Sequence, residues 1–408
     1  MDQRLVPEYL SLIRLAGGLA DRLGMGLYLV GGMVRDLLLG QSNFDIDLVV
    51  EGDAPVLTGL LAQHAGGEVV THHRFGTAKF RRGDLSMDLA TARSETYARP
   101  GALPTVQPGL IGGDLSRRDF TINAMAVHLD LAGFGDLLDP FGGEKDLAGK
   151  MIRALHDGSF VDDATRMLRA VRYEQRFDFR LEPATEQMLR RDISMLHTIS
   201  GDRIRHEIEL ILKERAPEKP LGRAAELGLL QAIHPSLRGN GWIARKFQEV
   251  RPAGQSPPLG LYLSLLVYHF SREEGEDLLT RLRVPGATAR VIRHTLSLKD
   301  NLGGLEDPHM SPAAVYNLLK DCSPTSAMAC AVATDSPVIR DRINLYLNRL
   351  RHVRTSLDGT AIQGEFEVAP GPRLGEILKM LHEAKLEQRV STRLEEMDLV
   401  RKWLSGGG

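Results

Sequence analysis

The period of the apolar residues changes once along this chain of 408 residues, near residue 159. Before that point, the apolar residues alternate between the spacing of strands and the spacing of helices. After it, nearly every segment repeats its apolar residues with the period of an amphipathic helix, for example "DDATRMLRAVRYEQRF". The sequence therefore predicts a small α/β domain at the N-terminal end, followed by a long helical part.

The α/β part is expected to contain a mixed sheet, with an antiparallel portion near its middle. The predicted elements, in chain order, are a helix over 7–23, the strand "LYLVGG", the helix "MVRDLLLG", the strand "FDIDLVV", the helix "DAPVLTGLLAQHAGG", and the strands "EVVTHH", "TAKFRRG" and "LSMDLATAR". Residues 97–116 are rich in proline and glycine, and we expect a long surface loop there.

Two aspartates one residue apart, Asp45 and Asp47, interrupt the apolar run of the strand "FDIDLVV". Side chains two positions apart leave the same face of a strand, so the two carboxylates repel each other unless a cation or a proton compensates. Magnesium accepts one or two carboxylates together with water and phosphate oxygens. The pair therefore predicts a magnesium site suited to phosphoryl transfer. Two solvated aspartates at a strand end would show the same pattern.

Gly31 and Gly32 separate a strand from a helix, so backbone N–H groups and the helix start can face a phosphate. Arg35, one turn into that helix, can supply a cation to the same phosphate. Taken singly, these residues also fit a plain tight turn and a surface charge. Together with the aspartate pair they predict a site for a triphosphate and a metal. Asp88 is either a third carboxylate or a strand-face aspartate paired with a basic residue.

Charged residues gather again in the segment "DLSRRDFTINAMAV", where Arg117, Arg118 and Asp119 precede an apolar run. One arginine can reach into a nucleotide site while Asp119 caps or positions the segment. A basic helix entry on the surface fits the same residues.

A third charged segment, "DDATRMLRAVRYEQRF", opens with Asp162 and Asp163. Negative charge is favoured at a helix start in any case, so a capping role explains both. Arg166, Arg169 and Arg172 recur every three residues on one helix face, as a solvated basic stripe would. Asp163 and Arg166 nevertheless form an i, i+3 pair that can present an acceptor and a fork of donors to the edge of a base.

Composition excludes several classes of protein. No run of about 18 apolar residues is available to cross a membrane as a helix, and the N-terminus lacks a signal-peptide core. The two cysteines form neither a zinc-ligand pattern nor a disulfide framework, and we expect a reduced, cytoplasmic protein. The net charge of -2 argues against a uniformly basic nucleic-acid binder, but it permits a local basic face.

Taken together, these motifs resemble the class II tRNA nucleotidyltransferase (CCA-adding enzyme) and bacterial poly(A) polymerase family, a branch of the polymerase-β-like nucleotidyltransferases. The matching segments span essentially the whole chain in the family's order, and they are "LVGGMVRDLLLG", "DIDLVV", "TARSETYARPGALP", "RRDFTINAMAV", "DPFGGEKDLAGKMIRAL", "DDATRMLRAVRYEQRFDFR", "GDRIRHEIELIL" and "PGPRLGEILKMLHEAKLEQRVST". One departure is that the family's neck motif usually begins Glu-Asp, whereas Asp162 stands here before Asp163. This substitution keeps the charge.

The resemblance implies a polymerase-β-like α/β nucleotidyltransferase head with a mixed sheet, followed by an all-α neck, body and tail in a seahorse shape. The expected ranges are 1–140 for the catalytic head, 141–215 for the neck, 216–300 for the body and 301–408 for the tail. The neck would select the nucleotide, and the body and tail would bind the acceptor and TΨC arms of tRNA through shape and phosphate contacts.

The resemblance also implies a role for each candidate residue. Asp45 and Asp47 would be catalytic and would bind Mg²⁺. The nucleotide-binding residues would be Gly32, Arg35 and Arg118 at the triphosphate, Asp163 and Arg166 at the base, and Arg169 and Arg172 nearby. Asp163 and Arg166 would select CTP or ATP by mimicking Watson–Crick pairing.

The expected reaction is the addition of CCA, or part of it, to the 3′ end of tRNA without a nucleic-acid template. A CC-adding enzyme, an A-adding enzyme and a poly(A) polymerase are alternatives within the same chemistry. The family's flexible loop would correspond to 97–116 and is not deleted, which favours the ability to add A. A non-catalytic RNA-binding protein would lack a metal aspartate. An antibiotic-type nucleotidyltransferase would not need the long helical part.

Overall fold

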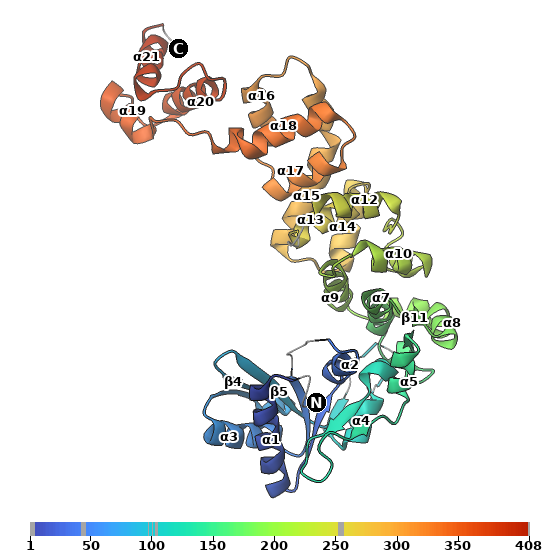
Figure 1. The fold of residues 1–408 in the computed structure, drawn as a ribbon. Coiled ribbons are helices and arrows are strands. Elements are labelled where there is room, and N and C mark those ends of the chain that lie inside the picture. Colours follow the sequence, from blue (N-terminus) through green and yellow to red (C-terminus); the bar gives the residue numbers. More distant parts are fainter. Residues whose placement is uncertain are drawn as a thin grey trace. The chain divides into compact units, whose positions relative to one another are not determined.

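The computed structural model describes residues 5–41, 46–96, 98–99, 101–102, 105–251 and 257–406. The chain divides into two compact units, Met1–Pro235 (unit 1) and Ser236–Gly408 (unit 2). Figure 1 follows the chain through them, from blue to red. The four domain ranges expected from the sequence are narrower than these units and stay predictions.

Unit 1 contains a seven-stranded sheet with the order β3-β4-β5-β2-β1-β8-β9. Its strands are β1 (Gly26–Val30), β2 (Ile46–Glu51), β3 (Glu68–His72), β4 (Thr77–Arg82), β5 (Leu85–Thr91), β8 (Ala126–His128) and β9 (Leu137–Leu138). The central strands β2 and β5 are parallel, whereas β3, β4 and β5 pair in antiparallel fashion. The mixed sheet and its antiparallel portion are therefore confirmed.

Helices of unit 1 form at the predicted places around this sheet. They are α1 (Pro7–Arg22), α2 (Gly32–Leu38) and α3 (Ala54–Ala65). α1 and α3 pack against each other, and α3 also packs against β3, β4 and β5. A 3₁₀ turn, η1 (His73–Phe75), connects β3 to β4. The glycine turn lies between β1 and α2, and Asp47 lies at the start of β2. The central strands of the sheet therefore position the residues predicted to bind the triphosphate and the metal.

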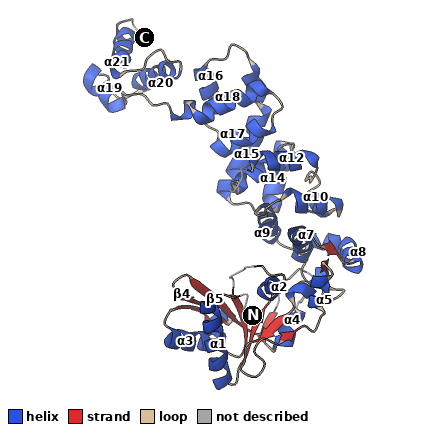
Figure 2. Ribbon diagram, viewed as in Figure 1, coloured by secondary structure: helices blue, strands red, loops and turns tan. Residues whose placement is uncertain are grey.

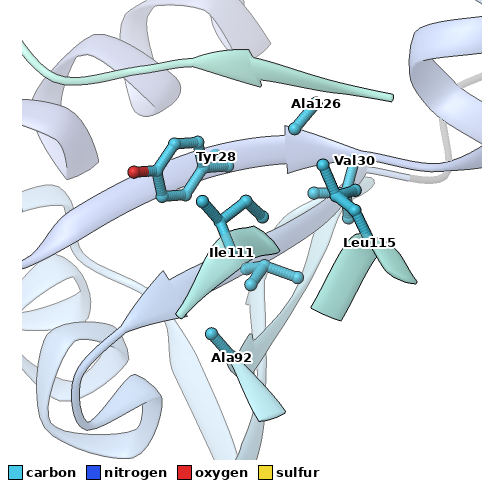
Figure 3. Packing of buried hydrophobic residues seen from close by; sticks show 7 residues of the cluster. Tyr28, Val30, Ala92, Ile111, Leu115 and Ala126 are labelled. Carbon is cyan, nitrogen blue, oxygen red and sulfur yellow. The ribbon is translucent and has the colours of Figure 1, made fainter. Parts of the chain in front are cut away.

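The prediction of a long loop over 97–116 is wrong for part of that range. β6 (Arg93–Thr96) and β7 (Thr105–Pro108) form a small antiparallel sheet, and α4 (Ile111–Ser116) follows. Ile111 and Leu115 are four residues apart, and both pack with Tyr28 and Val30 of β1 (Figure 3). Burial of these two apolar side chains on the sheet explains why a glycine-rich segment folds as a helix.

The rest of unit 1 is mainly helical, as the change of period near 159 predicts. Its elements are η2 (Thr121–Asn123), α5 (Gly143–Ala148), β10 (Met151–Ile152), α6 (Ser159–Asp162), α7 (Thr165–Phe177), β11 (Arg180–Leu181), α8 (Pro183–Asp192), η3 (Ile193–His197), α9 (Gly201–Leu212), α10 (Glu218–Glu226) and α11 (Leu229–Ile233). β10 and β11 form a short parallel pair that the sequence did not predict.

Every described element of unit 2 is a helix (Figure 2). These are α12 (Gly241–Val250), α13 (Leu259–Leu266), α14 (Arg272–Arg281), α15 (Gly286–Asp300), η4 (Leu302–Glu306), α16 (Pro312–Leu319), α17 (Pro324–Ala333), α18 (Pro337–Asn348), η5 (Leu350–His352), α19 (Gly359–Phe366), α20 (Pro372–Leu386) and α21 (Arg393–Ser405). Three of them begin with a serine cap followed by proline, at Ser311, Ser323 and Ser336. Serine accepts a backbone N–H there, and proline is favoured at the next position. Within the described ranges, no helix combines the length and the apolar character that a membrane crossing needs.

Candidate nucleotide and metal site

Asp47 is the second residue of β2, and its side chain is exposed between the buried Ile46 and Leu48. The parallel register sets Asp47 directly opposite Asp88 of β5, so the two carboxylates leave the same face of the sheet. Asp45 lies outside the described residues. One member of the predicted pair is therefore observed, and it has a carboxylate neighbour from another strand.

Asp88 also has a basic partner, because Lys79 Nζ lies 2.9 Å from its Oδ2 atom. The pairing with a basic residue is thus observed, and a role as third carboxylate of the metal site stays a prediction. Asp88 pairs with a lysine, and it stands beside Asp47. The ion pair is well exposed to solvent, where such pairs contribute little to stability. Asp88 can therefore exchange its partner at small cost.

The glycine turn between β1 and α2 needs Gly31 for two reasons. Its backbone has φ 66° and ψ -130°, a conformation that residues with a side chain rarely adopt. A Cβ atom at this position would also lie 2.4 Å from Nη1 of Arg118. The N–H group of Gly31 donates to the carbonyl of Met125 at 3.2 Å. The turn is therefore shaped around the guanidinium group of Arg118.

Arg35 is buried, and its guanidinium group faces the end of α7. Its Nη1 atom donates to Oδ1 of Asn123 at 2.6 Å, and its Nε atom donates to Oδ1 of Asp36 at 2.8 Å. The guanidinium group also lies 4.4 Å from the ring centroid of Phe177, a cation–π contact. These contacts hold Arg35 in one orientation.

Asp114 holds the two arginines of the "RRD" motif. Its side chain is fully buried, Oδ1 accepts from Nε of Arg117 at 3.0 Å, and Oδ2 accepts from Nη2 of Arg118 at 2.9 Å. Burial raises the pKa of Asp114, but the positive charges of Arg118 and Arg117 outweigh it and keep the pKa below its usual value. The Nε atom of Arg118 is buried without a hydrogen-bond partner in the described part of the chain.

Asp119 holds Arg169 in the same way. Oδ2 of Asp119 accepts from Nε and Nη2 of Arg169 at 2.9 and 2.7 Å, and Oδ1 accepts from Nδ2 of Asn123 at 3.0 Å. Burial raises the pKa of Asp119, but Arg169 and the amide of Asn123 outweigh it and lower the pKa. Asp119 therefore stays ionised and fixes Arg169 at the site.

These two carboxylates predict a loss of stability in acid. Because the pKa values of Asp114 and Asp119 are lower in the folded protein, their contribution is present above the unfolded pKa of about 3.9 and is lost as the pH falls through the folded pKa. Urea unfolding between pH 3 and 7 should show this decline. Asp119→Asn should lower the free energy of unfolding at pH 7 by roughly 3 kcal/mol and flatten the acid slope, since one buried ion pair is broken. An unchanged acid slope in this variant would contradict the assignment.

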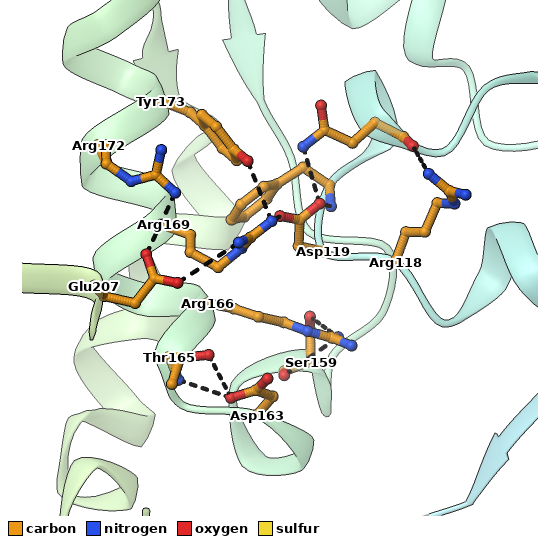
Figure 4. A network of polar contacts seen from close by, with 12 residues as sticks. Arg118, Asp119, Ser159, Asp163, Thr165, Arg166, Arg169, Arg172, Tyr173 and Glu207 are labelled. Carbon is orange, nitrogen blue, oxygen red and sulfur yellow. Dashed lines mark hydrogen bonds and ion pairs between the residues drawn. The ribbon is translucent and has the colours of Figure 1, made fainter. Parts of the chain in front are cut away.

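Asp163 lies between α6 and α7, one residue before Ala164, which is the N-cap of α7. Its Oδ1 atom accepts from the backbone N–H of Thr165 at 3.0 Å and from the Thr165 hydroxyl at 2.6 Å (Figure 4). Its Oδ2 atom forms an ion pair with Nη2 of Arg203 at 2.8 Å. Asp163 is therefore not the N-cap of α7, but one of its two carboxylate oxygens holds Thr165, the first residue of that helix.

Arg166 is buried and is held by two segments that are distant in sequence. Its Nη1 atom donates to Oγ of Ser159 at 2.8 Å, and its Nη2 atom donates to the backbone carbonyl of Arg117 at 2.7 Å. Figure 4 shows the guanidinium group of Arg166 beside Ser159. The guanidinium group thus connects α6, α7 and the "RRD" motif.

Arg169 and Arg172 share Glu207 as an ion-pair partner. Nη1 of Arg169 lies 3.6 Å from Oε1 of Glu207, and Nη2 of the buried Arg172 lies 3.3 Å from its Oε2 atom (Figure 4). Arg169 also reaches Asp119. Two steps of three residues leave Arg172 about 120° around the helix from Arg166, so the stripe does not stay on one face. Among the described residues, Arg172 does not line the cavity described next.

The site residues of unit 1 surround a cavity of about 590 Å³. Its lining is mainly polar and brings together carboxylates, guanidinium groups and one aromatic ring. The lining residues are Gly32, Arg35, Asp47, Glu95, Arg117, Arg118, Asp119, Asn123, Asp163, Thr165, Arg166, Arg169, Tyr173, Arg176 and Arg203. Guanidinium groups bind phosphate oxygens, and an exposed carboxylate binds a hard cation. The cavity can therefore hold a nucleotide polyphosphate together with a metal ion.

A second cavity, of about 620 Å³, lies in unit 2. Its charged lining includes Asp300 and Asp321, but no arginine or lysine among the described residues that line it. A triphosphate would be repelled there, so of these two cavities the one lined by Asp47 and Arg118 is the better candidate.

Several cavity residues were not selected from the sequence. Glu95, Asn123, Tyr173, Arg176 and Arg203 line the cavity, but each is a common residue in a helix or a short strand. The only sequence signal for Arg203 is its place in "GDRIRHEIELIL", and nothing in that motif reveals that it meets Asp163, 40 positions earlier in the chain.

Comparison with known families gives two matches. The family described as "Poly A polymerase head domain" matches residues 27–153, and the family described as "Probable RNA and SrmB-binding site of polymerase A" matches residues 178–239. The first match lies within unit 1, and the second begins in unit 1 and ends four residues into unit 2.

Curated relatives cover more of the chain. It is 31% identical to the A-adding tRNA nucleotidyltransferase of Halalkalibacterium halodurans, over 99% of this chain and 95% of that protein. It is 35% identical to the A-adding tRNA nucleotidyltransferase of Geobacter sulfurreducens, over 97% of this chain and 47% of that protein. The chain thus spans about half the length of the Geobacter relative.

Solved structures agree with this likeness. A CCA-adding enzyme in its apo form II superposes with a TM-score of 0.84 at 33% identity, over 98% of this chain and 96% of that one. The Thermotoga maritima CCA-adding enzyme complexed with tRNA superposes with a TM-score of 0.77 at 32% identity, over 98% of this chain and 97% of that one.

Proposed function

The chain belongs to the class II tRNA nucleotidyltransferase and bacterial poly(A) polymerase family, and from this premise we propose that it adds the terminal A to tRNA that already ends in CC. The observation that carries the proposal is the cavity of unit 1, which combines Asp47, several arginines and the Asp163–Arg166 pair. The choice of A is supported by the A-adding relatives, which are 31% and 35% identical over nearly the whole chain.

Complete CCA addition is the second candidate. It is favoured by the solved CCA-adding enzymes, which superpose over 98% of the chain with TM-scores up to 0.84. Both candidates use the same chemistry. The 3′-hydroxyl oxygen of tRNA forms a bond to the α-phosphorus, the bond to the β-phosphate oxygen breaks, and pyrophosphate leaves.

The arginine side of the cavity suits the triphosphate. In the proposed arrangement, Gly32 allows close approach of the backbone, and Arg35 and Arg118 carry the positive charge. Asp114 keeps the guanidinium group of Arg118 beside the glycine turn, at 2.9 Å from its own Oδ2 atom. Preorganised charges of this kind stabilise the negative charge that develops on the phosphate oxygens.

The carboxylate side of the cavity suits Mg²⁺. Asp47 supplies an exposed oxygen donor beside that of Asp88, and Asp45 is added on the basis of its spacing in the sequence. The described residues contain no group of three or more metal-ligand side chains. Water and phosphate oxygens would then complete the coordination, as Mg²⁺ generally prefers. When bound, the ion would neutralise phosphate charge and lower the pKa of the attacking hydroxyl group.

The Asp163–Arg166 pair suits the base. Adenine and cytosine each carry an exocyclic amine beside a ring nitrogen that accepts a hydrogen bond. A carboxylate can accept from that amine, and a guanidinium group can donate to the ring nitrogen. Guanine and uracil present a carbonyl and a ring N–H instead, so the same pair would reject them. This arrangement would select ATP or CTP without a template.

The remaining parts of the proposal concern partners and location. Unit 2 would bind the acceptor and TΨC arms of tRNA through shape and phosphate contacts. A cytoplasmic location, with access to tRNA and ATP, belongs to the same proposal.

The test is an incorporation assay with three tRNA transcripts, which end at the discriminator base, after the first C and after the second C. Each is incubated with CTP, with ATP or with both, in the presence of Mg²⁺. The proposal expects one AMP on the CC-ending transcript and no incorporation on the shorter ones. Full CCA on the shortest transcript would establish the second candidate instead. Long A tails on unrelated RNA would point to a poly(A) polymerase, and no incorporation would overturn the enzymatic proposal.

A further inference from the structure

We propose that Arg203 is a positioning residue that sets the base selectivity of the nucleotide site by fixing the carboxylate of Asp163. The inference rests on the proposed function, because it assumes that Asp163 contacts the base. Arg203 lies on α9, whereas Asp163 lies just before α7. The inference therefore adds a second helix to the selection of the base.

Arg203 and Asp163 meet at the wall of the cavity. Nη2 of Arg203 lies 2.8 Å from Oδ2 of Asp163, and both residues line the cavity. Their side chains are 27% and 20% exposed, so the ion pair is partly shielded but open to a ligand on one side. Arg203 is the third residue of α9.

The hydrogen bonds of Asp163 show why Arg203 matters. Oδ1 already accepts two hydrogen bonds from Thr165, which is the usual capacity of one carboxylate oxygen. The acceptor capacity left for a base amine is therefore on Oδ2, the oxygen that faces Arg203. Without Arg203, that oxygen would lose the charge that holds it, and the terminal torsion of an aspartate side chain is soft.

The donor half of the pair is held independently. Arg166 is anchored by Ser159 and by the backbone carbonyl of Arg117, and neither contact involves α9. Loss of Arg203 should therefore weaken recognition of the exocyclic amine and leave recognition of the ring nitrogen largely intact. This expectation separates a positioning role from a general contribution of positive charge to the cavity.

The experiment compares ATP with purine riboside triphosphate, in which a hydrogen atom replaces the amine while the ring nitrogen N1 stays a hydrogen-bond acceptor. The ratio of their kcat/KM values is measured on the CC-ending tRNA for the wild type and for Arg203→Ala. We expect the ratio to fall about 10-fold, the size expected for one misplaced charge-assisted hydrogen bond. Most of the change should appear in the KM for ATP. Arg203→Lys keeps a charge beside Oδ2 and should recover part of the ratio.

Two further variants sharpen the result. Arg203→Ala should have no added effect on the ratio in an Asp163→Ala background, because it acts through that residue. Arg205→Ala is the matched control on the same helix, since Arg205 pairs with Glu209 at 3.3 Å and does not belong to the described lining of the cavity. It should keep the wild-type ratio. Circular dichroism and thermal unfolding establish that each variant is folded.

Three outcomes would overturn the inference. An equal rise in KM for both nucleotides would mean that Arg203 supplies only charge, and a lower melting temperature with an unchanged ratio would mean that it is only structural. Additive effects of Arg203→Ala and Asp163→Ala would mean that the two residues act separately. If the wild type incorporates no nucleotide, the proposed function fails instead. If it incorporates only C, the same ratio is measured with CTP and zebularine triphosphate, which lacks the amine and keeps the ring nitrogen as an acceptor.

Discussion

Replacement of Asp47 by alanine is expected to lower the rate of nucleotide transfer about 10³-fold or more, because a metal carboxylate contributes several kcal/mol to phosphoryl transfer. Asp47 is exposed at the cavity, and its neighbours in β2 are buried, so the substitution removes a ligand without disturbing the core. Single-turnover incorporation into tRNA measures the rate, and filter binding should show that the affinity for tRNA is nearly unchanged.

Two other aspartates of the same sheet make this test sharper. Asp84→Ala alters an exposed residue in the turn between β4 and β5, and it should leave the rate unchanged. Asp88→Ala tests the carboxylate opposite Asp47 in the register, and a large loss of rate would make Asp88 a third metal ligand. Near-normal turnover of Asp47→Ala would contradict the metal assignment.

Replacement of Asp163 by alanine is expected to lower the preference for ATP over GTP about 10²-fold. The variant removes the acceptor for the base amine, and discrimination by a bidentate pair is worth roughly 1–3 kcal/mol. Steady-state incorporation with each nucleotide on the CC-ending tRNA measures the preference. The variant also loses the two hydrogen bonds to Thr165, so a modest loss of stability should accompany it.

The preceding residue provides the matched control. Asp162 has the same side chain, but its Oδ2 atom lies 3.7 Å from Nε2 of His156, and the described lining of the cavity does not include it. Asp162→Ala should therefore keep the preference for ATP over GTP. If Asp163→Ala also keeps it, the carboxylate does not read the base.

Periodicity alone was enough to predict most of the fold. The change near residue 159 separates a sheet-containing part from a helical one because strands and helices bury their apolar residues with different periods. Periodicity was not enough where the composition of a segment indicates a loop but its apolar residues are buried. Residues 105–116 carry the glycine and proline of a loop, yet Ile111 and Leu115 gain more by packing on β1 than the glycines lose.

Local spacing also predicted which charged segments belong to the site, but it did not predict which charged side chains are in contact. Asp47 and Asp88 become neighbours through the pairing of β2 with β5, and Asp163 meets Arg203 through the packing of α7 against α9. Both contacts join residues 40 or 41 positions apart, and they depend on tertiary packing. Arg172 shows the opposite case, because it shares Glu207 with Arg169 but does not belong to the described lining of the cavity, whereas Arg166 and Arg169 do.

The central claim is that the cavity of unit 1 holds the nucleotide with its triphosphate near Asp47 and its base at the Asp163–Arg166 pair. The most direct measurement is a crystal structure of the protein with a non-reactive ATP analogue and Mn²⁺, which is located by its anomalous scattering. We predict a metal peak at the Asp47 carboxylate, phosphates against Gly32 and Arg118, and the adenine edge on Asp163 and Arg166. A nucleotide bound in the cavity of unit 2, or an adenine edge that contacts neither residue of the pair, would contradict the account.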